Sequence, residues 1–501
     1  MQAFQIHERD NVSVALTELA EGINIKISGK EIRLLENIPR GHKIATNKIK
    51  QGDDIIKYGY PIGIAIKDIN EGEKVDENNI KTKLGKLLSY TYSPQKKIEQ
   101  SPYIKDSDKA LTFLGYPRIN GDVGTRNEVW VIPTVFCINN TAVKLGDIAK
   151  DLVKNYQNVD GVFAFPHHFG CSQMGKDHLT TQQVLKGLVN HPNAASVLIV
   201  GLGCENNNIE AFKQVLGTYD ENRVRFLNTQ DVKGNELEVG TEILKELLEY
   251  ANKFKRQPCP ISKIRLGLKC GSSDGLSGIT ANPMLGTLTD RISNLGGSVV
   301  MTEVPEMFGA EQVLMNRAQD RKVFEQIVAL INNFKQYYIS HGEIISDNPS
   351  PGNKKGGIST LEEKSLGCLQ KGGRAIVNGV LQYTQPLEKN GFYLLQSPGN
   401  DGVSTTALAV SGCTIIVYST GRGTPFGTAV PGIKVSSNNN LSINKPNWID
   451  FNAGLLVDGK DKKEVSDDLF RKLIRVASGE KTQDEIHGFK EINIWKDGVT
   501  L

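Results

Sequence analysis

The 501-residue sequence predicts a multidomain α/β protein that begins with a small all-β domain. Residues 1–88 contain short apolar runs separated by glycines, which is typical of short strands joined by tight turns. From about residue 110, apolar β-branched runs such as VWVIPTVFC and SVLIVGLGC are each followed by a helical pattern. Strands that alternate with helices in this way are typical of a parallel sheet.

The change from short strand patterns to alternating strand and helix patterns gives the expected domain boundaries. The all-β domain covers residues 1–88, and residues 89–109, which are polar and contain two prolines, are expected to form an exposed linker. A central α/β domain follows at 110–257. The run PCPISKIRLGLKCG then predicts a new strand that opens a second α/β domain over 258–501.

Composition narrows the class of protein. The chain has 39% apolar and 23% charged residues, which is ordinary for a soluble globular protein. Its net charge of +3 is not gathered into a basic stripe, so we expect no nucleic-acid partner. We expect no membrane partner, since no run approaches the ~18 apolar residues of a span. No signal peptide is recognisable, and the seven widely spaced cysteines suit reduced thiols in a cytoplasmic protein.

Several loops are unusually rich in Gly, Cys, Asn and Pro. Such loops leave backbone N–H groups free and allow close approach of a small, oxygen-rich anion, so together they indicate an enzyme. They read FPHHFGCSQMG (165–175), GLGCENN (201–207), CGSSDGLSGITANPMLG (270–286), TEVPEMFGAE (302–311), NPSPGNKKGG (348–357) and STGRGTPFG (419–427).

Three cysteines follow predicted strands or lie in the glycine-rich loops. If those strands are neighbours, the thiols of Cys137, Cys171 and Cys204 meet at one edge of the sheet, where they suit a soft metal or an iron–sulfur cluster. The alternative is packing of small residues at strand ends, because the sequence contains no C-x-x-C pair.

Other candidates come from side-chain chemistry. His167 is a candidate general base or metal ligand. Glu303 and Glu306, three residues apart, are candidates for acid–base work, or for charge compensation at a helix start. Asp274 suits a divalent metal, with the carbonyl oxygen of Asn282 as a further ligand or substrate contact. The candidate residues for binding a substrate carboxylate are Arg126, Lys354, Lys364 and Arg422.

These blocks, in this order, resemble the altronate/galactarate dehydratase family of sugar-acid hydro-lyases. The likeness runs nearly end to end, through IHERDNVSVALTELAEG, GHKIA, KYGYPIG, GCSQMG, SDGLSGITANPMLG, TEVPEMFGAEQ, EKSLGC and WIDFNAG. The resemblance implies an N-terminal SAF-type β-clip, a central α/β domain used in dimerisation, and a C-terminal Rossmann-like variant without a nucleotide role. A dehydrogenase is not expected, because the chain lacks a strand–GxGxxG–helix unit.

The resemblance also implies the reaction. It is dehydration of D-altronate to 2-dehydro-3-deoxy-D-gluconate in hexuronate breakdown, by a homodimer that uses divalent Fe²⁺ or Mn²⁺. The alternatives are galactarate as substrate, a related sulfo-lyase, or a sugar-acid-binding relative without activity. The last alternative arises because the His-rich HVHxHN run usual in the family is replaced by KVDENN, with Asp76 at one of the histidine positions.

The remaining histidines of the β-clip match the family pattern. Because His7 and His42 match that pattern, we expect them to bind the metal, with Asp76, Glu77 or Asn78 as harder replacement ligands, and we expect His42 or His167 to be the base that removes the C2 proton. The expected metal ligands are therefore His7, His42, Asp76, Cys171, Cys204 and Asp274.

Overall fold

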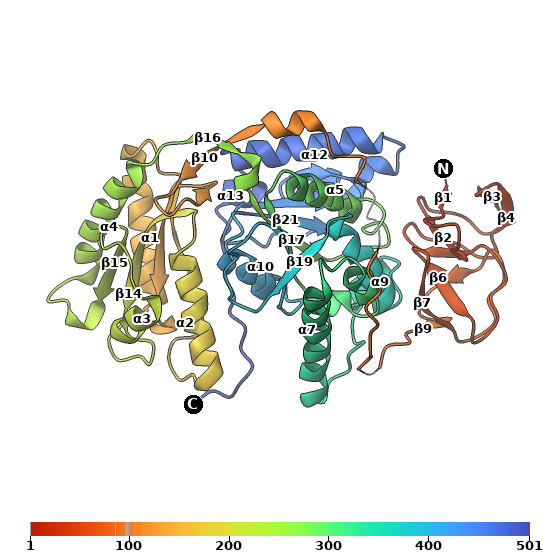
Figure 1. The fold of residues 1–501 in the computed structure, drawn as a ribbon, viewed down its shortest axis with the longest axis horizontal. Helices are drawn as coiled ribbons and strands as arrows, with labels where there is room; N and C mark the ends of the chain where they lie inside the picture. Colours follow the sequence, from red (N-terminus) through yellow and green to blue (C-terminus); the bar gives the residue numbers. More distant parts are fainter. Residues whose placement is uncertain (1, 86, 96–99) are drawn as a thin grey trace.

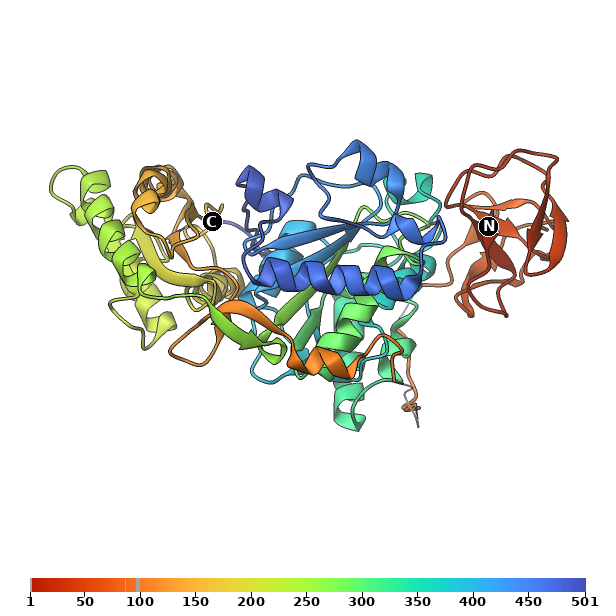
Figure 2. The same ribbon diagram turned by 90° about the horizontal axis from the view of Figure 1, so that it is seen from above.

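The computed structural model describes residues 2–85, 87–95 and 100–501. Three domains lie in a row, with the C-terminal domain in the middle and the N-terminal domain at one end (Figures 1 and 2). None of the described helices is both long enough and apolar enough to cross a bilayer. The expected mixed α/β architecture, with an all-β start and a parallel sheet toward the C-terminus, is confirmed.

The N-terminal domain, which we call the β-clip domain, is built from short antiparallel strands. Its sheets have the orders β1-β2-β5-β8, β6-β7-β9 and the hairpin β3-β4. Alternation of side chains explains the strands: in β3, Ile25 and Ile27 are buried while Asn24 and Lys26 are exposed. The strands are β1 (Ala3–Phe4), β2 (Val12–Ala15), β3 (Asn24–Ile27), β4 (Lys30–Arg33), β5 (Lys43–Ala45), β6 (Asp54–Lys57), β7 (Tyr60–Ala65), β8 (Lys74–Val75) and β9 (Ile80–Lys81).

One hairpin turn of the β-clip domain bears on the site. Between β6 and β7, Tyr58 and Gly59 both have positive φ, 62° and 76°. Two such residues in succession make the turn whose twist matches that of the flanking strands. A tyrosine rarely adopts this conformation, and here it directs the buried Tyr58 toward the C-terminal domain.

The segment expected to be an exposed linker is only partly exposed. Positions 96–99 of the expected linker lie outside the described residues. Tyr90 is half-buried, and its hydroxyl contacts Glu311 and, at 3.0 Å, the Nζ of Lys335. Further along, Asp108 in the 3₁₀ helix η1 (Asp106–Ala110) forms a buried ion pair with Arg291, with a 2.9 Å contact. The correction has a physical reason: the aromatic rings and the aspartate in this polar stretch find partners on the C-terminal domain.

The central domain has a four-stranded parallel sheet of order β13-β12-β14-β15. Helices α1 and α4 share a core on one face, while α2 and α3 cover the other face, which packs toward the C-terminal domain. The elements are β12 (Glu128–Pro133), α1 (Asn139–Leu152), β13 (Gly161–Ala164), α2 (Gly175–Val189), β14 (Ala194–Gly201), α3 (Ile209–Leu216), β15 (Val224–Asn228) and α4 (Glu236–Asn252), with 3₁₀ helices η2 (Phe136–Ile138), η3 (Val153–Asn155) and η4 (Thr229–Asp231).

A small antiparallel sheet marks the passage between the two α/β domains. Its order is β11-β10-β16, with β10 (Thr112–Pro117), β11 (Val123–Gly124) and β16 (Gln257–Pro260). The expected boundary at 257/258 therefore falls inside β16.

The C-terminal domain has a seven-stranded sheet in which every pairing is parallel, in the order β19-β20-β18-β17-β21-β22-β23. The strand order reverses between β17 and β21, and in such sheets ligands gather at the carboxyl ends beside this point. The strands are β17 (Arg265–Gly271), β18 (Ser298–Met301), β19 (Val377–Leu381), β20 (Gly391–Leu395), β21 (Ile415–Thr420), β22 (Gly432–Ser436) and β23 (Phe451–Asn452). This order places β20 between β18 and β19, so the Rossmann-like description stays a prediction.

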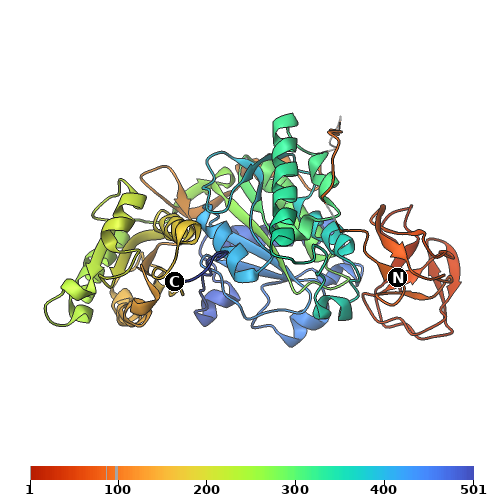
Figure 3. The same ribbon diagram turned by 90° about the horizontal axis from the view of Figure 1, so that it is seen from below.

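Helices cover both faces of this sheet (Figures 1 and 3). They are α5 (Ala281–Asn294), α6 (Glu311–Met315), α7 (Arg321–Ser340), α8 (Pro351–Lys355), α9 (Leu361–Leu369), α10 (Asp401–Val410), α11 (Asn439–Asn444), α12 (Lys462–Ala477) and α13 (Gln483–His487). The 3₁₀ helices are η5 (Ile261–Lys263), η6 (Val304–Met307), η7 (Gln370–Gly372) and η8 (Gly454–Leu456).

The C-terminal tail returns to the central domain. Leu501 N–H donates to Ser172 O at 3.0 Å, and Gly498 N–H donates to the Asp177 carboxylate on α2 at 2.8 Å. Figure 3 shows this dark blue end beside the central domain. Earlier in the tail, Lys490 forms a buried ion pair with Glu128 on β12, with a 2.6 Å contact. The tail thus ties the two α/β domains together.

Candidate active site

A group of charged side chains is buried at the carboxyl edge of the seven-stranded sheet. Lys269 and Cys270 lie at the end of β17, and Glu303 comes two residues after β18. Helix α9 and the adjoining 3₁₀ helices η6 and η7 bring the rest of the group: Glu306, Lys364, Cys368 and Lys371. We call these seven residues the charged cluster; all are buried.

Ion pairs hold the charged cluster together. Glu303 contacts Lys269 and, at 3.1 Å, the Nζ of Lys371, while Glu306 lies 2.8 Å from the Nζ of Lys364. Burying charges is costly unless each has a partner, so this many ionised groups in one place suggests a purpose beyond stability. Lys269 also pairs at 2.8 Å with Asp401, whose side chain is 37% exposed.

Two thiols and one carboxylate of this cluster could hold a metal. The Sγ atoms of Cys270 and Cys368 and a carboxylate oxygen of Glu306 all lie within 4.8 Å of one another. The Cys368 thiol donates to Glu306 Oε2 at 3.0 Å, and Cys270 Sγ lies 2.7 Å from Ser273 Oγ. Sulfur ligands suit Fe²⁺ or Zn²⁺ better than Mn²⁺, which prefers oxygen. The donor set therefore fits a borderline divalent cation, with Fe²⁺ favoured over Mn²⁺ among the expected metals.

The titration behaviour of the donors supports this fit. A hydrogen bond from Cys368 and the positive charge of Lys371 lower the pKa of Cys270 to about 5, although burial opposes them. Burial would raise the pKa of Glu306, but Lys364, Lys371 and Lys269 outweigh it and hold that pKa at about 2. One thiolate and one carboxylate are thus ionised at neutral pH, as metal ligands must be.

The pKa of Glu303 is shifted in the opposite direction from that of Glu306. Burial and the neighbouring Glu306 carboxylate raise the pKa of Glu303 to about 7, in spite of Lys269 and Lys371. Its backbone is left-handed, with φ of 70°, a conformation that is rare for a non-glycine residue. Strain of this kind gathers at functional sites. Two carboxylates with pKa values pushed apart suit opposite roles in proton transfer.

The β-clip domain closes over this edge of the sheet. Lys43 and Lys57 both pair with the buried Glu363 on α9, at 2.9 Å and 2.7 Å. Tyr58 lies against Gly278 and Gly367. The cavity under this contact, lined among others by Lys57, Tyr58, Asn282, Lys364 and Cys368, measures about 10 Å³. It holds about one water. The domain junction is closed in this structure.

A wider hollow of about 370 Å³ lies beside the small cavity. Its lining includes three cationic side chains, Arg40 of the β-clip domain together with Arg422 and Lys445. Asp274 lines both spaces. An anion that approaches the junction would therefore meet positive charge before it reaches the charged cluster.

The predicted residues of the C-terminal domain lie at or near this junction. Asn282 is buried and lines the small cavity; its Oδ1 accepts from Ser419 Oγ at 2.5 Å. Arg422 is exposed and donates to Gly352 O at 3.3 Å. Lys354 is half-buried on α8. Glu303 and Glu306 belong to the charged cluster.

Asp274 has its carboxylate occupied. Oδ1 accepts from Ser277 N, Ser277 Oγ and Ser437 Oγ, each at 2.8 Å, and Oδ2 accepts from Asn438 Nδ2 at 2.9 Å. These bonds join the loops after β17 and β22. The arrangement argues for a loop-fixing role rather than metal binding.

Of the β-clip residues, His42 lies at the junction. Its Nε2 is 3.3 Å from Lys355 O, and its buried Nδ1 has no partner among the described residues. Burial lowers the pKa of His42, so the imidazole is neutral at pH 7. His7 and Asp76 serve local turns: His7 Nδ1 accepts from Arg9 N, and Asp76 accepts from Asn78 N at 3.0 Å. The structure does not bring His7, His42 and Asp76 together as a ligand set.

His167 lies far along the chain in the central domain and is buried there. One ring nitrogen is 2.8 Å from Pro133 O and the other accepts from Phe169 N. Burial lowers the pKa of His167 to about 4. With both nitrogens engaged, the ring is poorly placed to act as the base.

The cysteines of the central domain do not form a ligand group. They lie after β12, β13 and β14, which are adjacent strands as the sequence argument required. Cys137 and Cys204 are exposed and Cys171 is partly exposed. Among residues 2–85, 87–95 and 100–501, however, their Sγ atoms are not gathered with other ligand atoms within 4.8 Å. The structure therefore gives no support to an iron–sulfur cluster at these thiols.

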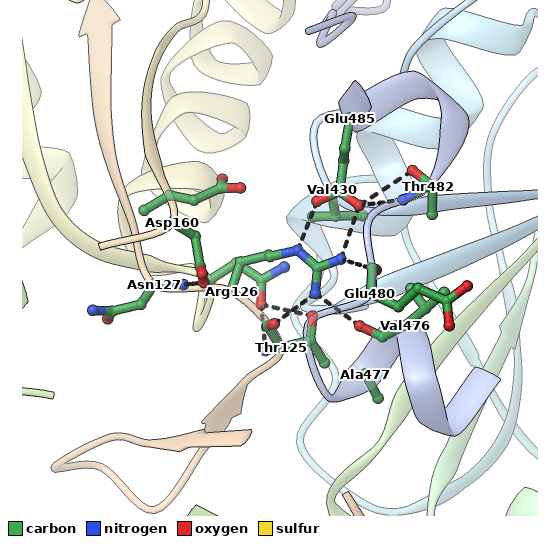
Figure 4. Close-up of polar contacts among 12 residues, drawn as sticks. Thr125, Arg126, Asn127, Asp160, Val430, Val476, Ala477, Glu480, Thr482 and Glu485 are labelled. Atoms are coloured by element: carbon green, nitrogen blue, oxygen red, sulfur yellow. Dashed lines mark hydrogen bonds and ion pairs between the residues drawn. The ribbon is translucent and has the colours of Figure 1, made fainter. Parts of the chain in front are cut away.

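Arg126 joins domains and has no donor left for a substrate. Its guanidinium binds both oxygens of Glu485 at 2.6 and 2.8 Å, and its other N–H groups donate to the carbonyl oxygens of Thr125, Val476 and Glu480, each at 2.8 Å (Figure 4). All five donors are used. This placement argues against the expected role in holding a carboxylate.

Sequence reasoning named Lys364 but missed the two thiols and the other two lysines of the charged cluster, Lys269 and Lys371, as site residues. Cys270 and Cys368 lie in the blocks CGSSDG and EKSLGC, far apart in sequence and without a ligand spacing. One signal was available: Lys269 is a charged residue within the apolar strand run RLGLKCG, and a lysine at a buried strand position needs a partner.

Comparison with known proteins agrees with this architecture. Residues 1–83 match the altronate/galactarate dehydratase SAF domain, residues 115–252 match the D-galactarate dehydratase/altronate hydrolase second domain, and residues 261–500 match the D-galactarate/altronate dehydratase C-terminal domain. The fold and site thus define a three-domain protein with a SAF domain at its start. The chain belongs to the altronate/galactarate dehydratase family.

Individual relatives are similar over the whole chain. The altronate dehydratase of Escherichia coli is 46% identical and that of Bacillus subtilis 48% identical, each with 100% of both chains covered. The galactarate dehydratase (L-threo-forming) of Escherichia coli is 32% identical over 95% of this chain and 93% of its own.

Proposed function

We propose that this protein is a hydro-lyase that dehydrates D-altronate to 2-dehydro-3-deoxy-D-gluconate in hexuronate breakdown. The similarity to two altronate dehydratases at 46–48% identity, against 32% for the galactarate enzyme, favours altronate as the substrate. The observation that carries the proposal is the buried cluster of Cys270, Cys368 and Glu306 with three lysines, at the ligand-binding edge of a parallel sheet.

The residues that would hold the family's divalent metal are Cys270, Cys368 and Glu306. When bound there, a divalent cation supplies Lewis-acid stabilisation of the negative charge that develops on the substrate's carboxylate and C2 oxygen. The chain's own contribution is to present ionised ligands in a water-poor site, through the lowered pKa values of Cys270 and Glu306.

Lysines would hold the anionic substrate. Lys43 and Lys57 share one carboxylate, Glu363, so these three groups together carry one net positive charge. Lys364 faces the same small cavity. A carboxylate that enters the junction would therefore replace an unfavourable excess of buried positive charge with an ion pair.

Proton transfer needs one group that accepts the C2 proton and one that protonates the departing C3 hydroxyl. We assign the first role to His42, which is neutral and whose Nδ1 has no hydrogen-bond partner within the described part of the chain. We assign the second role to Glu303, since a pKa of about 7 keeps much of this carboxyl protonated at neutral pH. Loss of water leaves an enol, which relaxes to the 2-keto acid.

The substrate would enter while the β-clip domain is displaced. A cavity of about 10 Å³ cannot admit a six-carbon acid, whereas the neighbouring hollow of about 370 Å³ can. The contact of Lys43, Lys57 and Tyr58 with the C-terminal domain would then re-form over the bound substrate and exclude water. Dimerisation through the central domain is a further proposal, testable by sedimentation.

The test is metal analysis joined to a substrate panel. Protein purified without oxygen is expected to contain about one equivalent of iron and to release 2-keto-3-deoxy acid from altronate faster than from galactarate. Chelation should abolish turnover, and Fe²⁺ should restore it better than Mn²⁺. Unchanged turnover after complete metal removal would contradict the metal assignment, and turnover of galactarate alone would contradict the substrate.

A further inference from the structure

A second polar hollow lies in the central domain, apart from the charged cluster. It measures about 360 Å³ and is found where β14 and β15 begin, at the amino ends of the strands. Its lining includes two arginines, Arg118 and Arg223, with the aromatic rings of Tyr219, Tyr250 and Phe254. The family's dehydration chemistry, as proposed above, uses none of these residues.

Both guanidinium groups are fixed by neutral acceptors. Arg118 donates to Pro192 O at 2.7 Å, to Asn127 Oδ1 at 2.8 Å and to Arg126 O at 2.9 Å. Arg223 uses only Nη2, which donates to the carbonyl oxygens of Val189 at 2.7 Å and Ala194 at 2.9 Å, with a longer contact to His191 O at 3.5 Å. Within the part of the chain that the structure describes, Nε and Nη1 of Arg223 have no hydrogen-bond partner and neither arginine forms an ion pair.

One carboxylate, that of Asp220, lines the same hollow. Asp220 accepts from the Tyr250 hydroxyl at 2.9 Å and from Asn222 N at 2.9 Å, so its oxygens are already engaged. Burial and the charge of Arg223 lower the pKa of Arg118 to about 9, and burial lowers the pKa of Arg223. Both arginines remain protonated at neutral pH, and the ionised Asp220 offsets one of their two charges, so the three groups together keep one net positive charge on this hollow.

We propose that this hollow is a binding site for a small organic oxyanion, either a carboxylate or a phosphate. Among the described residues, the Nε–H and both Nη1 hydrogens of Arg223 have no partner, so they remain as charge-assisted donors for an anion. Arg118 adds a second charge on the same hollow. The volume exceeds what one phosphate needs, and the aromatic rings supply apolar surface for the ligand's carbon skeleton.

The site lies beside the contact between the central domain and the C-terminal domain. Arg118 holds the backbone carbonyl of Arg126, whose own guanidinium reaches across to Glu485 of the C-terminal domain (Figure 4). An anion bound to Arg118 would thus lie one residue from the contact that joins the two α/β domains.

The experiment is calorimetric titration of the full-length enzyme with inorganic phosphate, with succinate and with the neutral polyol galactitol, at constant ionic strength. Saturable binding of phosphate or succinate is expected, and whichever binds identifies the anion class; galactitol is expected not to bind. In Arg223→Gln the affinity should fall at least about tenfold, since a hydrogen bond to a charged group contributes roughly that factor or more. Turnover of altronate by Arg223→Gln should remain at the wild-type rate.

Arg225→Gln is the matched control. This neighbouring arginine lies on β15, is more exposed, and already pairs with Glu246 at 2.5 Å, so its loss should leave binding unchanged. If Arg223→Gln fails to fold, Arg118→Lys serves instead, since lysine keeps the positive charge but lacks the planar, multi-donor guanidinium group. No saturable binding of either anion, or equal affinity in wild type and the Arg223 or Arg118 variant, overturns the proposal. An equal loss of anion affinity in Arg225→Gln would also overturn the proposal.

Discussion

The phenol oxygen of Tyr58 lies so close to Gly278 that a methyl group added to this glycine would come within 2.0 Å of it. Tyr58 belongs to the β-clip domain and Gly278 to the loop before α5 of the C-terminal domain. The contact needs both the left-handed turn of Tyr58 and the absence of a side chain at Gly278. It defines how closely the β-clip domain can approach the charged cluster.

Gly278→Ala is expected to push the β-clip domain away from the sheet. Overpacking of a well-packed contact costs roughly 1–3 kcal/mol, so the melting temperature should fall and turnover should drop. Thermal unfolding and an altronate assay measure both effects. Gly85→Ala is the control, because nothing lies within 4 Å of its added methyl. Normal stability and rate in Gly278→Ala would show that the contact is not needed.

Docking of the β-clip domain should depend on pH through Glu363. Burial opposes ionisation, but Lys43 and Lys57 outweigh it and depress the pKa of Glu363 from 4.5 to about 2. A carboxylate with a depressed pKa stabilises the folded state above its unfolded pKa, and this stabilisation is lost as the pH falls toward the folded value. Stability measured in denaturant should therefore decline between about pH 4.5 and pH 2. Glu363→Gln should be less stable at pH 7, and its stability should not show this decline between about pH 4.5 and pH 2.

Cysteine variants separate metal binding from packing. Cys368→Ser and Cys270→Ser should each lower bound iron and reduce turnover at least about 100-fold, since even the supporting shell of a metal site accounts for 10–100-fold. The thiolate charge-transfer absorption of a cobalt-substituted enzyme should weaken in each of these variants, because one of two sulfur ligands is removed. Cys413→Ser is the control: Cys413 is equally buried, its Sγ lies 3.7 Å from the Ser411 hydroxyl, and among the described residues it belongs to no candidate ligand group. Full cobalt–thiolate absorption in Cys368→Ser would exclude it as a ligand.

Arg126→Met should affect stability rather than substrate binding. Removing one partner of a buried ion pair costs about 3–5 kcal/mol because the remaining charge, here Glu485, is left unpaired. The melting temperature should fall while the KM for altronate of the folded fraction stays unchanged. A raised KM with normal stability would return Arg126 to the role that the sequence predicted.

His42→Asn and Glu303→Gln test the proton-transfer assignments. Each is expected to reduce kcat by about 10²–10⁴-fold, the usual contribution of one positioned acid or base. Bound iron should be retained in both, which separates this loss from loss of metal. For Glu303 the wild-type pH profile should show a group near pH 7 that is absent from Glu303→Gln. Full turnover in His42→Asn would remove this histidine as the base.

The sequence predicted the architecture well because its patterns are local. Buried strands such as VWVIPTVFC and SVLIVGLGC form β12 and β14, and the glycine-punctuated start forms the β-clip domain. Most described residues of the expected linker are exposed, but the anchoring of Tyr90 and Asp108 was not foreseen, because their partners Glu311 and Arg291 lie more than 180 residues away. Contacts between residues so far apart cannot be recognised from a short stretch of sequence.

The site was predicted less completely for the same reason. Glu303 and Glu306 were recognised because they share one loop, whereas Cys270 and Cys368 come from β17 and α9 and meet only in the fold. Arg126 illustrates the opposite error. A guanidinium beside a glycine-rich block suits an anion chemically, and only the folded contacts show that Glu485 occupies it.

The contact of Gly498 with Asp177 has a consequence for biosynthesis. Asp177 lies on α2 of the central domain, whereas Gly498 is synthesised 321 residues later, after the whole C-terminal domain. On the nascent chain this face of the central domain therefore stays uncovered until the C-terminal domain has been made.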